Sequence, residues 1–165
     1  MSARLFTSLR RDHRGAALIE LALAAPVMAA LLIGMSDLAR AYSLKLLLEQ
    51  ASQRTIEQVE QQKSVVAGGY NTALSAEAAS AMTDAGYSTG NTVTPDSWLE
   101  CSSNGTTWAK QSSFSGACGQ TDTTARYVKV TISRSFVPMF ASRAWPGADS
   151  NGNITISGTA EVRVQ

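Results

Sequence analysis

Residues whose types suit catalysis or metal binding are few in this chain. Its 165 residues include one His and two Cys. A structural zinc site takes four nitrogen or sulfur ligands, so these three residues cannot supply one. The single His, His13, lies among arginines near the N-terminus, and the chain has no Walker or dinucleotide-binding pattern. We therefore expect no metal, no cofactor and no catalytic residue.

Two short patterns resemble functional motifs but lack the required context. Residues 86–90 read G-Y-S-T-G, which fits the G-x-S-x-G nucleophile motif. That motif needs a strand before it and a helix after it, whereas here a predicted helix precedes and a polar loop follows. Residues 149–153 read D-S-N-G-N, like the start of a calcium loop. The positions that should hold Gly and Glu are occupied by Ile154 and Ala160, so we interpret this segment as a turn.

The charge distribution indicates a targeting segment rather than a binding patch. The chain has a net charge of +1, and only 16% of its residues are charged. A near-neutral chain is not a general nucleic-acid binder. The basic excess is confined to residues 1–15, which contain four Arg and one Asp. A basic leader placed directly before the most apolar stretch is typical of membrane targeting.

The apolar stretch is long enough to cross a bilayer. Residues 16–35 contain one charged residue, Glu20. As a helix, 20 residues would span about 30 Å, the thickness of a hydrocarbon core. The positive-inside rule then places the leader in the cytoplasm and the rest of the chain outside it. A carboxylate near the membrane edge calls for a partner or a function, and snorkelling to the interface is the alternative.

Four interpretations of this stretch compete. A cleaved secretory signal would use Ala22-Leu23-Ala24, but cleavage there would leave an apolar segment on a soluble protein. The second is a plain uncleaved anchor. The third, a buried core helix, leaves the basic leader unexplained. The fourth rests on the order Arg14-Gly15-Ala16 followed by Glu20, which resembles the class III signal of type IV pilins and pseudopilins. That resemblance implies cleavage after Gly15 by a prepilin peptidase and pairing of Glu20 with a neighbour's new N-terminal ammonium.

A longer block extends this resemblance. The segment from residue 14 to 43 resembles the TadE-like family of the Tad (tight adherence, Flp-type) pilus system. The matching positions are Gly15, Glu20, Pro26, Gly34, Asp37 and Arg40, and Leu21 stands where the family usually has Phe. Pro26 should kink the helix, and Gly34 either allows close helix approach or is simply tolerated.

The resemblance implies a structural role. It points to a minor pseudopilin, without enzymatic activity, that takes part in assembly of a pilus for adhesion and surface attachment. The implied partners are the prepilin peptidase, other pilins and pseudopilins, the inner-membrane assembly platform and the lipid bilayer. Two alternatives stay open: a type II secretion pseudopilin, and an uncleaved, membrane-anchored periplasmic module that binds a ligand through loops with Trp98, Trp108 and Trp145.

Periodicity predicts the remaining elements. Apolar residues on one side of a 3.6-residue wheel continue the helix to about residue 66, and they are Leu44, Leu47, Leu48, Ala51, Ile56 and Val59. A second helix is expected over residues 71–85, and a hairpin with strands at 98–101 and 106–109. Alternating segments at 126–136 and 153–165 predict two strands with one apolar face each, joined by a long surface loop.

These elements give the expected organisation. Residues 1–15 form a cytoplasmic leader, 16–36 a transmembrane helix, 37–66 its amphipathic continuation, and 67–165 a periplasmic domain of an inner-membrane protein. The expected fold is α+β and pilin-like, with a long N-terminal helix packed on a small antiparallel sheet. In an oxidising periplasm Cys101 and Cys118 would form a disulfide, and two free thiols are the alternative.

Overall fold

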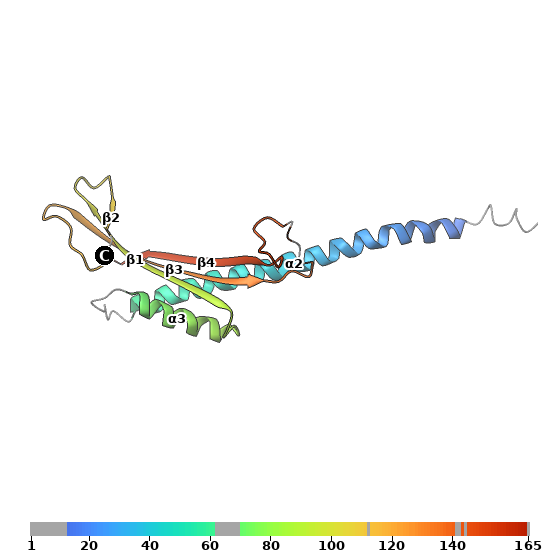
Figure 1. Ribbon diagram of the computed structural model, residues 1–165, viewed down its shortest axis with the longest axis horizontal. Coiled ribbons are helices and arrows are strands. Elements are labelled where there is room, and N and C mark those ends of the chain that lie inside the picture. The colour runs from blue at the N-terminus through green and yellow to red at the C-terminus, as the bar shows by residue number, and fades with distance from the viewer. Residues whose placement is uncertain (1–12, 62–69, 112, 141–142, 144, 165) are drawn as a thin grey trace, which may run out of the picture. The chain divides into compact units, whose positions relative to one another are not determined.

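A computed structural model describes residues 13–61, 70–111, 113–140, 143 and 145–164. Two helices are followed by four strands: α2 (His13–Gln61), α3 (Asn71–Asp84), β1 (Asn91–Ser102), β2 (Ala109–Gln111), β3 (Thr123–Phe136) and β4 (Ile154–Arg163) (Figure 1). The chain divides into two compact units, Met1–Arg40 and Ala41–Gln165, and α2 contributes to both. Unit 1 and unit 2 are described separately below.

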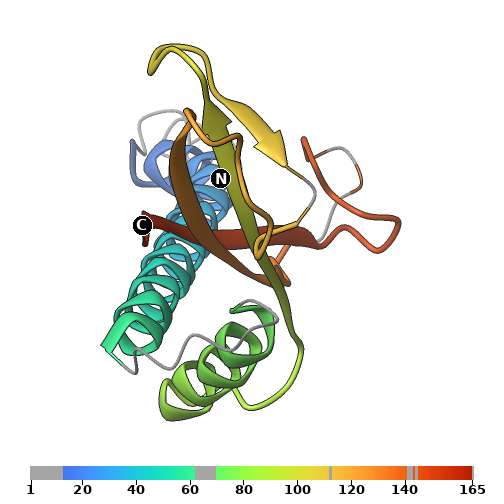
Figure 2. The same ribbon diagram turned by 90° about the vertical axis from the view of Figure 1, so that its left-hand side faces the viewer.

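Unit 2 is built on an antiparallel sheet with the strand order β2-β1-β3-β4. The α2 residues of this unit and α3 lie on the same side of the sheet, as Figure 2 shows. The fold is therefore α+β, as predicted. The expected strands at 126–136 and 153–165 and the expected helix at 71–85 are all present. The predicted end of the long helix near residue 66 lies outside the described residues.

The core of unit 2 forms between the apolar face of the sheet and the apolar sides of the helices. Val128, Val130 and Ile132 alternate along β3 and are almost completely buried. Apolar residues of both helices pack against them: Leu44, Leu48, Ala51, Ile56 and Val59 of α2, and Leu74, Ala78, Ala81 and Met82 of α3. The residues of β3 and α2 are those that the alternation and the helical wheel assign to the interior, and Leu47, also assigned to it, is partly buried against the same core.

Two hydroxyls are buried on the same side of α2. Ser52 donates a hydrogen bond to the Leu48 carbonyl at 2.8 Å, and Thr55 donates one to the Ala51 carbonyl at 2.7 Å. Each hydroxyl is satisfied within its own helix, so its burial leaves no unpaired polar group.

The closest approach of helix and sheet is at Gly158 in β4. A Cβ atom added to Gly158 would lie 2.3 Å from the carbonyl carbon of Leu48 and 2.4 Å from the backbone nitrogen of Glu49. Nearby, the Lys45 ammonium donates a hydrogen bond to the Ser157 carbonyl at 2.6 Å. Only a residue without a side chain fits beneath the helix backbone at this point.

The predicted hairpin exists, but its loop is longer than expected. The second strand, β2, begins at Ala109 rather than at residue 106. The side-chain oxygen of Asn104 accepts hydrogen bonds from the backbone N–H groups of Thr106 and Thr107, at 3.0 and 2.9 Å. Those two N–H groups are therefore used inside the turn and are not available to a strand ladder.

The strand β1 begins earlier than the sequence indicated. Residues 91–97 pair with β3 over their whole length, although they are mostly polar and include Pro95. The short strand β2 pairs only with Leu99, Glu100 and Cys101. In the part of the chain that the structure describes, Pro95 thus has a strand neighbour on one side only, which is the edge position where proline is tolerated in a sheet.

Candidate functional site

The apolar segment of unit 1 forms a helix whose large side chains are exposed all round. Ten of them are between 58% and 72% exposed, and they are Leu18, Ile19, Leu21, Leu23, Val27, Met28, Leu31, Leu32, Met35 and Leu38. By length and composition, one described helix, Ala17–Gln61, is able to cross a membrane. A helix that is apolar on every side is unfavourable in water, and such a surface marks a membrane or protein contact.

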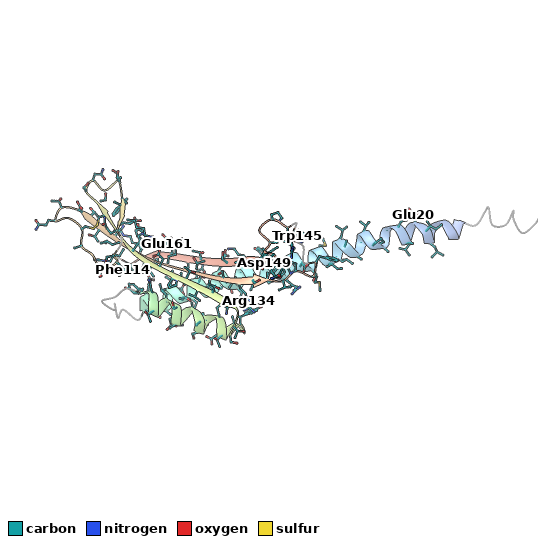
Figure 3. The ribbon with its side chains drawn as sticks, in the orientation of Figure 1. Glu20, Phe114, Arg134, Trp145, Asp149 and Glu161 are labelled. Atoms are coloured by element: carbon teal, nitrogen blue, oxygen red, sulfur yellow. A yellow bond between two sulfur atoms is a disulfide. The ribbon has the colours of Figure 1, made fainter. Side chains whose placement is uncertain are left out.

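Gly15, Ala16 and Glu20 all lie within α2. The helix begins at His13, so the bond after Gly15 lies inside its first turns and not in an extended segment. Glycine costs about 1 kcal/mol relative to Ala in a helix, which makes local unwinding at this bond easier. Glu20 is exposed on the otherwise apolar surface, as Figure 3 shows.

The helix itself does not require glycine at either predicted position in unit 1. A Cβ atom added to Gly15 or to Gly34 would meet no atom within 4 Å. Pro26 is accommodated inside the continuous helix α2. The described fold therefore gives no packing reason for Gly15 or Gly34, in contrast to Gly158.

Asp37 and Arg40 form an ion pair. An Arg40 guanidinium nitrogen lies 3.2 Å from a carboxylate oxygen of Asp37, three residues earlier on α2. Pairs at this spacing stabilise a helix by about 0.2–0.5 kcal/mol. The pair places one charge of each sign directly after the apolar segment.

Cys101 and Cys118 are joined in a disulfide, with their Cα atoms 5.6 Å apart. The bond links the end of β1 to the segment that precedes β3. The Arg126 guanidinium supports the same segment, because it donates hydrogen bonds at 3.1 Å to the carbonyls of Phe114 and Gly116. The disulfide thus holds a loop that has little regular structure of its own.

Neither motif-like pattern has the context of a functional motif, and residues 149–153 form a turn, as predicted. Residues 86–90 connect α3 to β1, the reverse of the strand-to-helix order that a nucleophile motif requires. In residues 149–153 the Asp149 carboxylate accepts hydrogen bonds from the backbone N–H groups of Asn151 and Asn153, at 2.8 and 2.9 Å. These bonds, with that from Asn153 contributing most, hold the pKa of Asp149 below its usual value.

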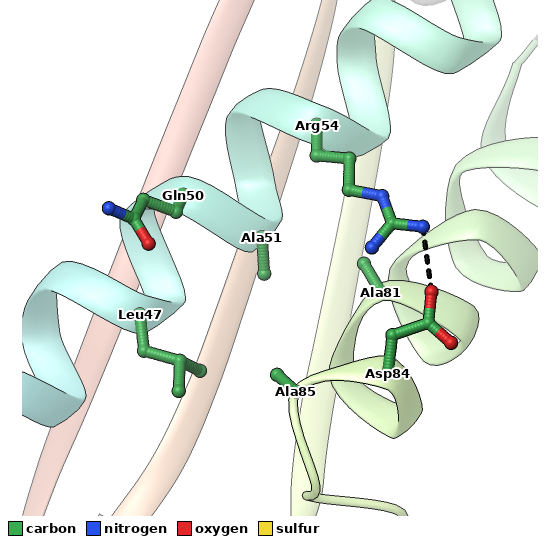
Figure 4. Close-up of a pocket in the computed structure, with 7 residues that line it drawn as sticks. All are labelled: Leu47, Gln50, Ala51, Arg54, Ala81, Asp84 and Ala85. Atoms are coloured by element: carbon green, nitrogen blue, oxygen red, sulfur yellow. Dashed lines mark hydrogen bonds and ion pairs between the residues drawn. The ribbon is translucent and has the colours of Figure 1, made fainter.

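A groove of about 280 Å³ lies between α2 and α3. Its lining is mostly aliphatic, with an ion pair between Arg54 and Asp84 at 2.6 Å, as Figure 4 shows. Both charged side chains are about half exposed. Within the described residues, no three His, Cys, Asp or Glu side chains gather in a way that would hold a metal ion. The groove offers packing surface but no acid–base or nucleophilic group pair.

The three tryptophans differ in their surroundings. Trp98 belongs to β1 rather than to a loop, is 8% exposed, and stacks on Tyr127 with ring centroids 5.5 Å apart. Its indole N–H is bonded to Glu100 at 2.9 Å. Trp108 directly precedes β2, with the Arg163 guanidinium 5.8 Å from its ring centroid. Trp145 is half exposed in the loop between β3 and β4. The predicted set of ligand-contacting tryptophans is therefore not one surface.

The exposed helix lies within a match to a known protein family. The family model of TadE-like proteins matches residues 15–56. The N-terminal segment is TadE-like. The match covers 42 of the 165 residues, and it includes the six matching positions from Gly15 to Arg40. The match is therefore a likeness of the N-terminal segment to TadE-like proteins.

The TadE-like match ends within α2, so most of unit 2 lies outside it. No curated protein and no solved structure matches the chain. Sequence reasoning identified the TadE-like segment but missed the exposed apolar side chains of Val137, Met139 and Phe140 in unit 2. Their signal was the short run V-P-M-F at the start of an otherwise polar loop.

Proposed function

We propose that the protein is a bitopic minor pseudopilin, processed by a prepilin peptidase, that takes part in assembly of a Tad-type pilus used for adhesion and surface attachment. The observation that carries this proposal is the start of the TadE-like match. It begins at Gly15, the residue after which the peptidase would cut, and it continues through the exposed apolar helix.

The exposure of the apolar side chains supports a membrane location for residues 16–36. Nine large hydrophobic residues of this range, around the whole circumference of the helix, would be costly in water and favourable in lipid. The four Arg of residues 1–15 favour a cytoplasmic leader. Residues 37–66 and the domain 67–165 are then periplasmic, where the disulfide of unit 2 is chemically stable.

Glu20 has a defined role in this proposal. Cleavage after Gly15 leaves an ammonium group on Ala16, at the end of an apolar helix. When such helices pack together, a carboxylate and an ammonium that are each costly in a dry environment neutralise one another. Pairing of Glu20 with the ammonium of a neighbouring subunit would therefore favour assembly and set the axial offset between the subunits.

The size of unit 2 favours a minor or initiating subunit. This unit carries its own core, a four-stranded sheet and a disulfide. A small major pilin of the Tad system would be mostly helix. A bulky folded domain suits a subunit that occurs rarely, at a tip or in a priming complex.

Cleavage is tested by co-expressing the chain with the prepilin peptidase of its own pilus system. The mass and the N-terminal sequence are measured for the parent, for Gly15→Ala and for the matched control Gly34→Ala. We expect the parent and Gly34→Ala to begin at Ala16, and Gly15→Ala to keep its leader. A parent chain that still begins at Met1 would contradict the proposal and favour an uncleaved, anchored module.

Assembly is tested separately with Glu20→Ala and the matched control Glu57→Ala, which lies on the exposed side of α2. We expect both variants to be cleaved. Glu20→Ala should fail to restore pili in a deletion strain, whereas Glu57→Ala should restore them. Normal piliation with Glu20→Ala would show that the carboxylate does not serve assembly.

A further inference from the structure

The exposed large hydrophobic side chains of unit 2 gather in two places among the described residues. The first is the loop between β3 and β4, where Val137, Met139, Phe140 and Trp145 are 50–63% exposed. The second is the beginning of α2 within this unit, where Tyr42 and Leu46 are exposed. We call the four loop residues the apolar cap.

Both places lie at the same end of unit 2. The Lys45 ammonium is bonded to the Ser157 carbonyl, and the next residue, Gly158, lies against the backbone of Leu48. Because the beginning of β4 precedes Ser157, it lies toward the helical turn that contains Tyr42. Phe136, the last residue of β3, pairs with Ile154, the first residue of β4. The loop that joins these two strand ends therefore leaves the sheet near the point where the chain enters unit 2; Figure 3 shows Trp145 at these strand ends.

Hydrogen bonds between described residues of the loop hold Phe140 and Trp145 of the apolar cap in place. The indole N–H of Trp145 donates a hydrogen bond to the Phe140 carbonyl at 3.2 Å, so these two residues are tied together. The N–H of Ala148 bonds to the Trp145 carbonyl at 3.1 Å, and the turn at Asp149 closes the base of the loop. Since the indole N–H is already satisfied inside the protein, its ring is able to leave water without stranding a polar donor.

We propose that the apolar cap inserts into the interfacial layer of the bilayer, in the leaflet from which α2 emerges. This inference rests on the proposed function, because it requires residues 16–36 to span the membrane. Residues 37–41 would then cross about 7 Å of the headgroup layer, which brings Tyr42 to its outer part. Tryptophan and tyrosine are the residues enriched at this depth.

The occupant is a lipid surface for two reasons. The exposed apolar residues lie at the end of unit 2 that follows the membrane-spanning segment, where the bilayer is the nearest apolar phase. The same loop carries the exposed guanidinium of Arg143, which suits lipid phosphates and is held by a bond from its Nε to the Ser150 carbonyl. Insertion would give unit 2 a second membrane contact and fix its tilt above the bilayer.

The test uses the full chain in vesicles of phosphatidylcholine and phosphatidylglycerol. Two variants are compared, Trp108→Phe and Trp145→Phe. Both keep the buried Trp98. The second fluorescent tryptophan is Trp145 in Trp108→Phe and Trp108 in Trp145→Phe. Flotation with the vesicles and resistance to alkaline extraction first establish that α2 is anchored, so a failure of anchoring is recognised separately. Tryptophan fluorescence is then quenched either by lipids with a spin label near the headgroup or by aqueous acrylamide.

We expect Trp145, the reporter in Trp108→Phe, to lose fluorescence to the lipid label and to be protected from acrylamide. We expect Trp108, the reporter in Trp145→Phe, to show the opposite. A chain that is anchored but whose Trp145 stays open to acrylamide in lipid overturns the inference. This holds even if added pilin subunits later protect Trp145, because the occupant would then be a protein. Adding Phe140→Ser to Trp108→Phe should reduce the lipid quenching without lowering the unfolding temperature of unit 2.

Discussion

Replacing Gly158 with Ala tests how α2 sits on the sheet of unit 2. The added Cβ atom would lie 2.3 Å from the carbonyl carbon of Leu48 and 2.4 Å from the nitrogen of Glu49. Non-bonded carbon atoms prefer separations of about 3.5–4.0 Å, so helix and strand must part by roughly 1 Å or more. Because both contacting atoms belong to the backbone, no side-chain rotation relieves the clash.

The cost follows from two opposing effects. Overpacking a well-filled core costs about 1–3 kcal/mol. An unstrained change from Gly to Ala in a strand would instead stabilise by about 0.5–1 kcal/mol, since glycine loses more backbone entropy on folding. We therefore expect a net loss of about 1 kcal/mol. For a unit of this size, that corresponds to a fall of about 5 °C in the unfolding temperature.

Thermal unfolding of the full chain in detergent micelles measures this effect. Near-ultraviolet circular dichroism reports on unit 2, because all three tryptophans belong to it. The matched control is Thr155→Ala, which changes an exposed residue of β4 and should shift the free energy of unfolding by no more than about 0.5 kcal/mol. If Gly158→Ala unfolds at the parent's temperature, the helix does not press on β4 at this point and our account of the core is wrong.

Three further predictions concern bonds of unit 2. Cys101→Ser should lower the free energy of unfolding by about 3 kcal/mol, measured by denaturant titration. Reductant should destabilise the parent by the same amount and leave the variant unchanged. A variant that reductant still destabilises would show that Cys118 is not the partner of Cys101. The pKa of Asp149 is lowered in the folded chain, so its contribution to loop order is present above the unfolded pKa of about 3.9 and is lost as the pH falls through the folded pKa. Trp145 fluorescence should change over that acid range in the parent and not in Asp149→Asn. Asp84→Asn removes the half-exposed pair with Arg54, and a loss above about 1 kcal/mol in the same titrations would contradict the surface character of this pair.

The core of unit 2 was predictable because each of its elements carries a strong period of its own. Val128, Val130 and Ile132 alternate with polar residues, so their common side is fixed by the two-residue repeat of a strand. Leu44, Leu48 and other apolar residues of α2 repeat at helical spacing and face the same interior. Short-range periodicity is sufficient here because both patterns persist over several turns or residue pairs.

The features that were missed depend on long-range pairing. Residues 91–97 have little apolar character, and they form a strand because β3 offers them a partner along its whole length. The burial of Trp98 follows from the same pairing, because Tyr127 lies opposite it in the register. Glycine is required at position 158 because the backbone of α2 at Leu48, 110 positions earlier in the sequence, lies directly against it. None of these contacts leaves a local signal.

The glycines of the two units differ in whether contacts inside the described fold explain them. Gly158 is required by the fold, because a backbone atom of α2 occupies the place of its side chain. Gly15 and Gly34 have open space around them, so the described fold has no need of either. Both nevertheless lie within the TadE-like match, on a helix whose exposed apolar surface is unfavourable in water. The proposed function supplies an external reason for each glycine: recognition by a peptidase at Gly15, and contact with a closely packed helix or with lipid at Gly34.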